Sequence, residues 1–322
     1  MIEFAFTFFL IVFELIYIAY AKGKNWVDNP NSRSSHHKPI VRGGGIIIFF
    51  AIAISSFLYL QYIWLGVGIT ILGIIGIIDD ITGLNQRIRL IGQAIAVLAF
   101  FIILPTEQIS LVTIILLVIV AVGMVNTMNF MDGINGITIA YSLVMLGTIY
   151  YMNDSNNLFP DRFFIWPGIS LLVFAFFNFR NTALSFAGDI GSTAIGYLLV
   201  FLTFYLILSE HNLSYILLWS VYGIDSVLTV VHRILKRENI FKAHRSHLYQ
   251  YYANELGSSH LSVATFYGLI QGIINVLFII NIRYQFVSQL IFTILILSGS
   301  GLIYLLLRSS VVRKLKLINQ GN

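Results

Sequence analysis

Long apolar stretches alternate with short polar segments along almost the whole chain. Eleven of the apolar stretches are long enough to cross about 30 Å of hydrocarbon as helices. They lie near residues 3–21, 44–60, 62–78, 88–104, 109–126, 133–151, 163–178, 191–209, 212–233, 259–282 and 286–307. The pattern predicts an all-α fold, a polytopic transmembrane helical bundle of about 11 spans that forms one integral membrane domain over residues 1–322.

Composition supports this class. Hydrophobic residues make up 58% of the 322 residues and charged residues only 10%, which is too apolar for a water-soluble domain of this size. The absence of Cys excludes disulfides, thiolate nucleophiles and Cys-ligated metals. The first apolar stretch is followed by Lys22 and Lys24 without a small-residue cleavage site, so we expect a retained span.

Basic residues orient the chain. Of the 19 Lys and Arg, 17 fall on or next to the side that carries the longer loops, and only Arg162 and Arg283 fall opposite. The positive-inside rule therefore predicts that the long loops are cytoplasmic, with the N-terminus outside and the C-terminus in the cytoplasm. The basic tail at 313–316 is interpreted as a topological anchor after the last span.

The predicted cytoplasmic loops hold the candidate chemistry. They lie near 22–43, 79–90, 126–136, 178–192 and 234–258, and they are rich in Asp, Asn, His and Gly. Carboxylates beside membrane helices are costly unless they are paired, hydrated or metal-bound, so each is a functional candidate. The candidates are Asp79, Asp80, Asp132, Asp189 and Asp225. For any single one, a helix cap is the alternative.

Two segments suggest anion binding. Arg42 precedes Gly43, Gly44 and Gly45, and this run could present a guanidinium and bare amides to a phosphate, or form a flexible hinge. The helix expected after Asp189 has an N-terminus that favours anions.

Two further groups of polar side chains stand out. Asn126, Asn129 and Asp132 are spaced to line one helical face. His244, Arg245 and His247 form a compact cationic cluster suited to diphosphate or sugar oxygens, with a structural or headgroup-binding basic loop as the alternative. Asn178 is either a helix C-cap or a substrate contact, and His211 and His260 are treated as bystanders.

The order of these motifs resembles a known family. The chain carries Asp79–Asp80, NTMNFMDGING at 126–136, GDIGS at 188–192 and HRSHL at 244–248, which is similar to the polyprenyl-phosphate N-acetylhexosamine-1-phosphate transferases. The segment VDNPNSRSSHHKPIVRGGG at 27–45 is similar to the first cytoplasmic loop of the bacterial branch. The resemblance covers about residues 27–250, and Asn135 stands where many bacterial relatives carry Asp.

The resemblance implies an enzyme that transfers a sugar 1-phosphate from a UDP-N-acetylhexosamine to polyprenyl (undecaprenyl) phosphate and releases UMP, with Mg²⁺ or Mn²⁺. The donor would be UDP-GlcNAc or a UDP-deoxy-amino sugar. The segment HRSHLYQ looks more like O-antigen or capsule initiators than the peptidoglycan enzyme, which implies lipopolysaccharide synthesis at the cytoplasmic face of a bacterial inner membrane. Membrane lipids and a second copy of the chain are further expected partners, and nucleic acid is not.

Site roles follow from the resemblance together with charge. Asp189 and Asn129 are the expected metal ligands, because hard cations prefer carboxylate and carbonyl oxygens. The predicted catalytic residues are Asp79, Asp80, Asp132, Asp189 and His247. The predicted substrate-binding residues are His36, Arg42, Arg89, Asn126, Asn178, His244 and Arg245. Direct attack by the lipid phosphate is favoured over an aspartyl intermediate, because its oxygen is already an anion.

Two readings without enzymatic activity stay open. A secondary transporter would also be polytopic and could use interfacial carboxylates as proton relays, but it predicts acids in mid-span and an internal repeat. A scramblase or structural membrane subunit needs no site for a divalent cation.

Overall fold

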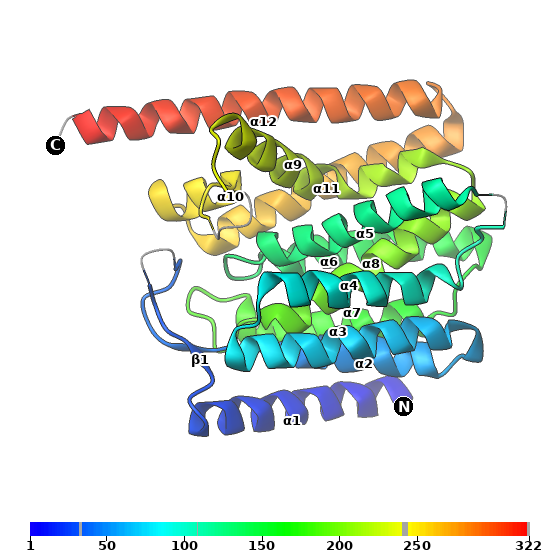
Figure 1. Ribbon diagram of the computed structural model, residues 1–322, viewed down its shortest axis with the longest axis horizontal. Helices are drawn as coiled ribbons and strands as arrows, with labels where there is room; N and C mark the ends of the chain where they lie inside the picture. Colours follow the sequence, from blue (N-terminus) through cyan, green and yellow to red (C-terminus); the bar gives the residue numbers. More distant parts are fainter. Residues whose placement is uncertain (32–33, 108, 240–243, 321–322) are drawn as a thin grey trace.

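The computed structural model describes residues 1–31, 34–107, 109–239 and 244–320, and over these the chain is almost entirely helical (Figure 1). The long helices are α1 (Ile2–Gly23), α2 (Ile46–Phe57), α3 (Ile63–Thr82), α4 (Gln86–Phe101), α5 (Leu111–Met131), α6 (Ile137–Asn156), α7 (Arg162–Asn178), α8 (Gly188–Ser209), α9 (Ser220–Leu235), α11 (His260–Tyr284) and α12 (Gln289–Gln320). Shorter pieces are the 3₁₀ turns η1 (Leu60–Tyr62) and η2 (Leu213–Trp219), α10 (Leu248–Gln250), and the π-helical η3 (Tyr251–Glu255).

Each predicted span contains one long helix, so the all-α, polytopic prediction is confirmed. Within the described ranges, seven helical segments are long and apolar enough to cross a membrane. Large apolar side chains are exposed along α1, α5, α11 and α12, which is where lipid would contact a bundle of this kind. The chain is therefore an integral membrane protein in its architecture.

The last helix runs beyond the predicted span at 286–307. We expected a tail after Leu307, but α12 continues to Gln320. The extension is held by packing, because Val311 is buried with Leu248 and Tyr304 in a small cluster next to α10. Local sequence also permits it, since 308–320 contains neither Gly nor Pro.

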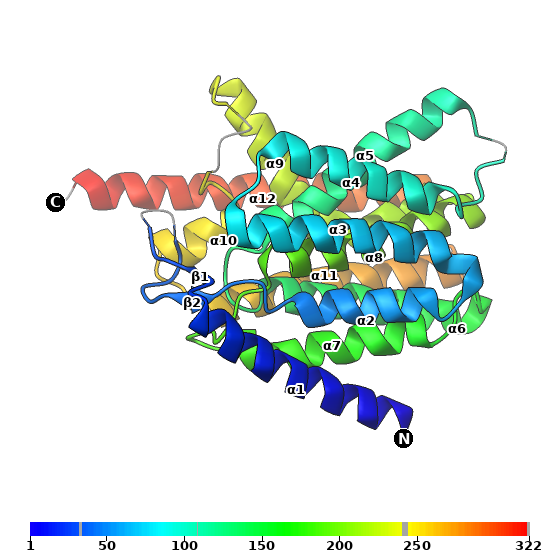
Figure 2. The same ribbon diagram turned by 60° about the horizontal axis from the view of Figure 1, so that its bottom comes forward.

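Helix α8 lies at the centre of the bundle. In its most apolar stretch 89% of the residues are buried, against 17% in α5 and 11% in α12. Glycines allow its close packing: a Cβ on Gly191 would lie 2.6 Å from the Cα of Gly45. Figure 2 shows that α5, by contrast, leans away from the bundle at its N-terminal end.

One feature of the first loop departs from the helical pattern. Strand β1 (Val27–Asp28) pairs antiparallel with β2 (Ile40–Val41), and Val41 forms a parallel bridge with Ser185. The loop before α2 is therefore pinned to the loop before α8. Neither loop could have shown this pairing alone.

The interpretation of Gly43–Gly45 as free amides or as a hinge is wrong. The Gly44 and Gly45 amides donate to the carbonyl oxygens of Phe186 (2.9 Å) and Ala187 (3.0 Å), so they hold the chain rather than a phosphate. Gly43 has φ +83°, and a Cβ there would lie 2.4 Å from the Tyr17 hydroxyl oxygen. This position requires glycine.

A buried acid in the middle of α1 was not anticipated. Glu14 is fully buried, and its Oε1 accepts a hydrogen bond from Ser185 Oγ at 2.8 Å. A Cβ on Gly44 would lie 2.4 Å from the same oxygen. Glu14 therefore anchors the loop before α8 to the first helix, which gives this mid-span acid a packing role.

Candidate active site

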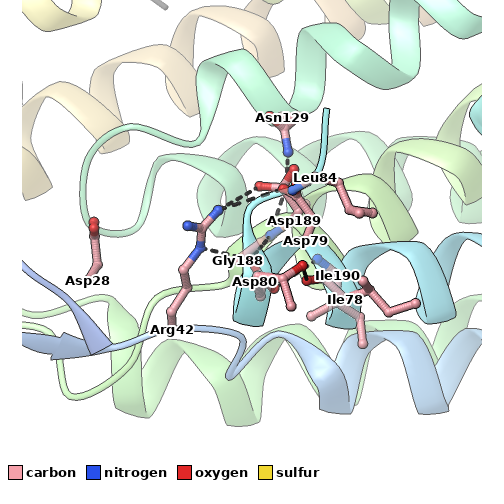
Figure 3. Close-up of polar contacts among 12 residues, drawn as sticks. Asp28, Arg42, Ile78, Asp79, Asp80, Leu84, Asn129, Gly188, Asp189 and Ile190 are labelled. Atoms are coloured by element: carbon pink, nitrogen blue, oxygen red, sulfur yellow. Dashed lines mark hydrogen bonds and ion pairs between the residues drawn. The ribbon is translucent and has the colours of Figure 1, made fainter. Parts of the chain in front are cut away.

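Five charged residues from four parts of the chain converge at one end of the bundle, and Figure 3 shows four of them, Arg42, Asp79, Asp80 and Asp189. This is the end that carries β1 and α10, opposite the N-terminus (Figure 1). We call Arg42, Asp79, Asp80, Arg89 and Asp189 the carboxylate–arginine cluster. Arg42 follows β2, Asp79 and Asp80 end α3, Arg89 begins α4, and Asp189 begins α8.

The two guanidinium groups bridge the three carboxylates. Arg42 Nε lies 2.8 Å from Asp80 Oδ1, and its Nη2 lies 3.2 Å from Asp189 Oδ1 and 3.9 Å from Asp79 Oδ2. Arg89 Nη1 lies 3.2 Å from Asp79 Oδ2, and its Nη2 lies 2.5 Å from Asp189 Oδ2. The cluster carries a formal charge of −1, since three carboxylates face two cations, so room for further positive charge remains.

Asp79 shapes the turn between α3 and α4. Helix α3 ends at Gly83, whose φ of +70° is a left-handed C-cap. Asp79 Oδ1 accepts a hydrogen bond from the Leu84 amide at 2.6 Å. Because Asn85 then caps α4, the turn places Arg89 beside Asp79 one helical turn later.

Asp80 caps α8 from a distant part of the chain. Its two carboxylate oxygens accept hydrogen bonds from the amides of Asp189 (2.9 Å) and Ile190 (3.3 Å), in the first turn of α8. The N-terminus of α8 thus binds an anion, as predicted, but these amides hold a carboxylate of the protein itself. Gly188 has φ +68°, and a Cβ there would lie 2.3 Å from Asp80 Oδ2, so only glycine fits this approach.

A cavity of about 290 Å³ opens beside Asp189. The predicted residues that line it are His36, Arg42, Asn129, Asp132, Asn178 and Asp189. Its walls come from the first loop, the C-terminal ends of α5 and α7, and the start of α8. The fold therefore gathers four of the five polar segments singled out in the sequence around one space.

Several lining residues are fixed by the chain. Asn178 Oδ1 accepts from the Gly136 amide (2.8 Å), and its Nδ2 donates to the Ser185 carbonyl (2.9 Å). His36 Nε2 lies 3.2 Å from the Asp28 carbonyl oxygen, and its ring meets Phe186 edge-on. These contacts stiffen the cavity wall, which is the preorganisation that a binding site needs.

Asp132 and Arg42 have shifted acidities. Burial, with the negative charges of Asp189 and Asp80, raises the pKa of Asp132 to about 7, although Thr138 Oγ1 donates to it at 2.6 Å. Burial alone would lower the pKa of Arg42, but Asp80 and the other carboxylates outweigh it and raise this pKa. Arg42 is thus a permanent cation at the cavity wall.

Asn129 and Asp189, the expected metal ligands, are neighbours. Both contact Arg89, because its Nη2 also donates to Asn129 Oδ1 at 3.3 Å. Asn129 Nδ2 donates to Ser192 Oγ at 3.2 Å, so carboxylate, amide and hydroxyl oxygens gather at the cavity. Across the described parts of the chain, no group of three or more His, Asp or Glu forms a metal cluster.

The remaining predicted residues do not line this cavity. Asn126 Nδ2 donates to Gln93 Oε1 (2.6 Å) and to the Val122 carbonyl (3.0 Å). Arg245 Nε lies 3.6 Å from Glu255 Oε1. Asp79, Asp80 and Arg89 do not line the cavity either. The substrate roles given to Arg89, Asn126 and Arg245 stay predictions. Lys242, which flanks the histidines, lies outside the described residues.

His244 and His247 belong to a second polar group. Their rings meet edge-on with centroids 4.9 Å apart. Burial, aided by nearby positive charges, lowers the pKa of His244 to about 4, so the expected cationic cluster lacks this charge at neutral pH. His247 is buried against Asp225, with Nδ1 3.2 Å from Oδ1.

Sequence reasoning missed several residues of the cavity. His260, interpreted as a bystander, lines it, and its Nδ1 accepts from the Asn135 amide at 3.4 Å. Asp28, Ser192 and Gln250 line it as well. The available signal was position, because His260 begins a predicted span on the same face as the motifs.

A protein-family model and a known protein each match a large part of this chain. The family model described as glycosyl transferase family 4 matches residues 62–207. Over these residues the chain resembles glycosyl transferase family 4. It is similar to a protein of Bacillus subtilis (strain 168) named "Probable undecaprenyl-phosphate N-acetylglucosaminyl 1-phosphate transferase". The two are 27% identical over 245 residues, which covers 69% of this chain and 68% of that relative.

The glycosyl transferase family 4 match includes some of the site residues and leaves others outside it. Residues 62–207 contain Asp79, Asp80, Arg89, Asn129 and Asp189. They do not contain Arg42, nor the paired Asp225 and His247. The structure joins Arg42 to the matched region through its ion pairs with Asp80 and Asp189.

Proposed function

We propose that this protein transfers N-acetylhexosamine 1-phosphate from a UDP-sugar to polyprenyl (undecaprenyl) phosphate and releases UMP, as the resemblance to glycosyl transferase family 4 suggests. The observation that carries the proposal is the carboxylate–arginine cluster beside a polar cavity at one end of a membrane-type bundle. A soluble donor and a lipid acceptor can meet only at such an interface. The name of the Bacillus subtilis relative supports the same acceptor and reaction class.

The reaction moves one phosphoryl group between anions. An oxygen of the lipid phosphate attacks the phosphorus that bears the sugar, the bond from that phosphorus to the bridging oxygen breaks, and UMP leaves with the electron pair. The protein's main task is then positioning and charge neutralisation. We favour direct attack without a covalent aspartyl intermediate, because the lipid phosphate is already an anion.

The residues of this chain divide that task. Arg42 lines the cavity as a permanent cation and is suited to phosphate oxygens. Asp80 holds the first turn of α8, and through it the backbone that carries Asp189. Asp79 fixes the turn that presents Arg89. Asp132 reaches the cavity from the end of α5.

The oxygens at Asp189 and Asn129 fit a divalent cation. When bound, Mg²⁺ or Mn²⁺ would neutralise charge on the donor diphosphate. Arg89 Nη2 contacts oxygens of both residues, so cation binding and these two contacts compete for the same atoms. The excess negative charge of the cluster favours the cation.

The finer assignments follow the sequence. We propose UDP-GlcNAc or a UDP-deoxy-amino sugar as donor, a site on the cytoplasmic face of a bacterial inner membrane, and a role in starting O-antigen or capsule polysaccharide. The 17 basic residues on or next to the predicted cytoplasmic side support this orientation. Assembly as a homodimer remains an expectation.

A panel of UDP-sugars tests the proposal. Purified protein in detergent is incubated with undecaprenyl phosphate, Mg²⁺ and each labelled UDP-sugar, and both lipid-linked product and UMP are measured. We expect one amino-sugar donor to give equal amounts of the two. UMP or lipid product absent for every donor would refute the transferase, and proton-coupled uptake by vesicles containing the protein would favour a transporter.

A further inference from the structure

We propose that Asp225 is a positioning residue that fixes the ring orientation and the tautomer of His247. Both side chains are almost fully buried, at 1% and 2% exposed, and His247 Nδ1 lies 3.2 Å from Asp225 Oδ1. The importance of His247 for turnover rests on the proposed function. The tautomer does not, because it depends only on contacts within this chain.

Asp225 is held as an acceptor on both oxygens. The Leu248 amide, which can only donate, bonds Oδ1 at 3.1 Å, and the Tyr267 hydroxyl bonds Oδ2 at 2.7 Å. A carboxylate that accepts on both oxygens has no proton to give to an imidazole. His247 Nδ1 must therefore carry the hydrogen that it shares with Asp225.

Helix α12 supports the carboxylate from behind. Arg308 Nη1 donates to the Tyr304 hydroxyl (2.7 Å) and to the Ser246 carbonyl (3.0 Å). Tyr304 in turn bonds Thr229 at 3.0 Å, and Thr229 Oγ1 lies 3.2 Å from Asp225 Oδ1. Contacts from α9, α11 and α12 thus leave the carboxylate little freedom to turn.

The other ring nitrogen of His247 is left available. In the neutral form of the ring, a hydrogen on Nδ1 leaves a lone pair at Nε2. Nε2 is buried and has no hydrogen-bond partner among the described residues. A buried, unpartnered nitrogen is unfavourable unless a ligand or water satisfies it.

Residues 247–250 connect the His247 ring to the cavity beside Asp189. The His247 amide donates to Gln250 Oε1 at 3.2 Å, and Gln250 lines the cavity beside Asp189. Between them, the Tyr249 hydroxyl donates to the Phe130 carbonyl at 2.9 Å, two residues before Asp132. The His247 ring that Asp225 orients therefore lies on the same short segment, 247–250, that contributes Gln250 to the cavity wall.

Nitrogen NMR of ¹⁵N-histidine-labelled full-length protein in detergent measures the tautomer directly. The His247 signals are assigned by their loss in His247→Asn. We expect wild type to carry the hydrogen on Nδ1, and Asp225→Leu to shift it to Nε2, because a leucine side chain offers Nδ1–H no acceptor. Tyr304→Phe is the matched control, since it disturbs the same network but leaves the carboxylate, and it should keep the wild-type tautomer.

Two NMR results would overturn the proposal. One is a wild-type ring with its hydrogen on Nε2, and the other is a His247 ring in Asp225→Leu that keeps its hydrogen on Nδ1. The first result needs only the wild-type spectrum, so the proposal can be refuted even if the Asp225 variant does not fold.

Kinetics separate positioning from simple support of the fold. Asp225→Leu should lower kcat at least about tenfold, as expected for loss of an orienting partner. In a His247→Asn background the same change should cost less than about twofold, because there is no ring left to orient. Fully additive losses would assign Asp225 a structural role instead. If no UDP-sugar is turned over by wild type, the proposed function fails while the NMR result still decides this inference.

Discussion

The carboxylate–arginine cluster and the Asp225–His247 group use similar side chains in opposite ways. In the first, three carboxylates share two guanidinium groups, and Arg42 and Asp189 face an open cavity. In the second, one carboxylate is satisfied mainly by neutral donors, and both Asp225 and His247 are closed off from solvent.

The difference teaches how to distinguish a ligand-binding site from a supporting one. Buried charges are stable only when compensated. The first cluster retains excess negative charge next to a cavity, so an outside cation or a charged substrate can complete it. The second is complete except for His247 Nε2, so it fixes geometry and leaves one atom for an outside partner.

Chelation gives the largest expected contrast. We expect EDTA to abolish transfer and Mg²⁺ or Mn²⁺ to restore it, because the oxygens of Asp189 and Asn129 suit a hard cation. The measurement is UMP release before and after metal is added back, with the His247 tautomer as a readout that should not change. Full turnover in the presence of chelator would show that the carboxylate–arginine cluster needs no bound cation.

Asp189→Asn should lower turnover at least about a hundredfold while the protein stays folded in detergent. The change removes one ligand charge and both arginine ion pairs of Asp189 but keeps its shape. Asp161→Asn, an exposed acid at the start of α7, is the matched control and should retain activity. An active Asp189→Asn enzyme would shift the cation toward Asp79 and Asp80.

Arg245→Ala tests whether the second region also touches the donor. A charge-assisted contact to phosphate contributes about 1.5–3 kcal/mol, so KM for the UDP-sugar should rise roughly 10-fold to 100-fold. Isothermal titration of the donor with Mg²⁺ present measures binding directly, and Lys236→Ala, on the exposed surface of the same segment, is the control. Unchanged donor affinity would contradict a donor-binding role for Arg245.

Asp80→Asn should lower kcat and leave donor binding largely intact, because Asp80 supports α8 rather than lining the cavity. It should also lower the free energy of unfolding by about 1–2 kcal/mol, the usual effect of losing a helix cap. Thermal unfolding in detergent, compared with donor titration, checks both. Loss of donor binding at unchanged stability would contradict the capping role.

The smallest expected effect is a pH dependence of stability from Asp132. Its pKa of about 7 in the folded protein lies above the ordinary value of about 3.9, so the unfolded chain loses the proton first. Between about pH 4 and 7 the folded state therefore loses stability as pH rises. Asp132→Asn removes this loss, so its Tm relative to wild type should increase from pH 5 to pH 8 in chelator. A Tm difference between Asp132→Asn and wild type that does not change with pH would contradict the raised pKa of Asp132.

The sequence predicted the helices well because hydropathy is a local property. A stretch of about 20 apolar residues must span or be buried as a helix whatever its neighbours are. The alternation of spans then brought the ends of α3, α5 and α7 and the start of α8 to one side, so the positions of Asp79, Asn129, Asn178 and Asp189 at one end of the bundle followed from counting alone.

Only the tertiary structure decided which of these side chains meet and what each one holds. Asp80 caps a helix 109 residues away, the Gly44 and Gly45 amides hold residues 186–187, and Asp225 orients a histidine from another element. None of these contacts can be recognised from the local sequence. A carboxylate at a helix end has the same sequence context whether it binds a metal, an arginine or a backbone amide. The choice depends on the packing of α8 against its neighbours, which no single segment encodes.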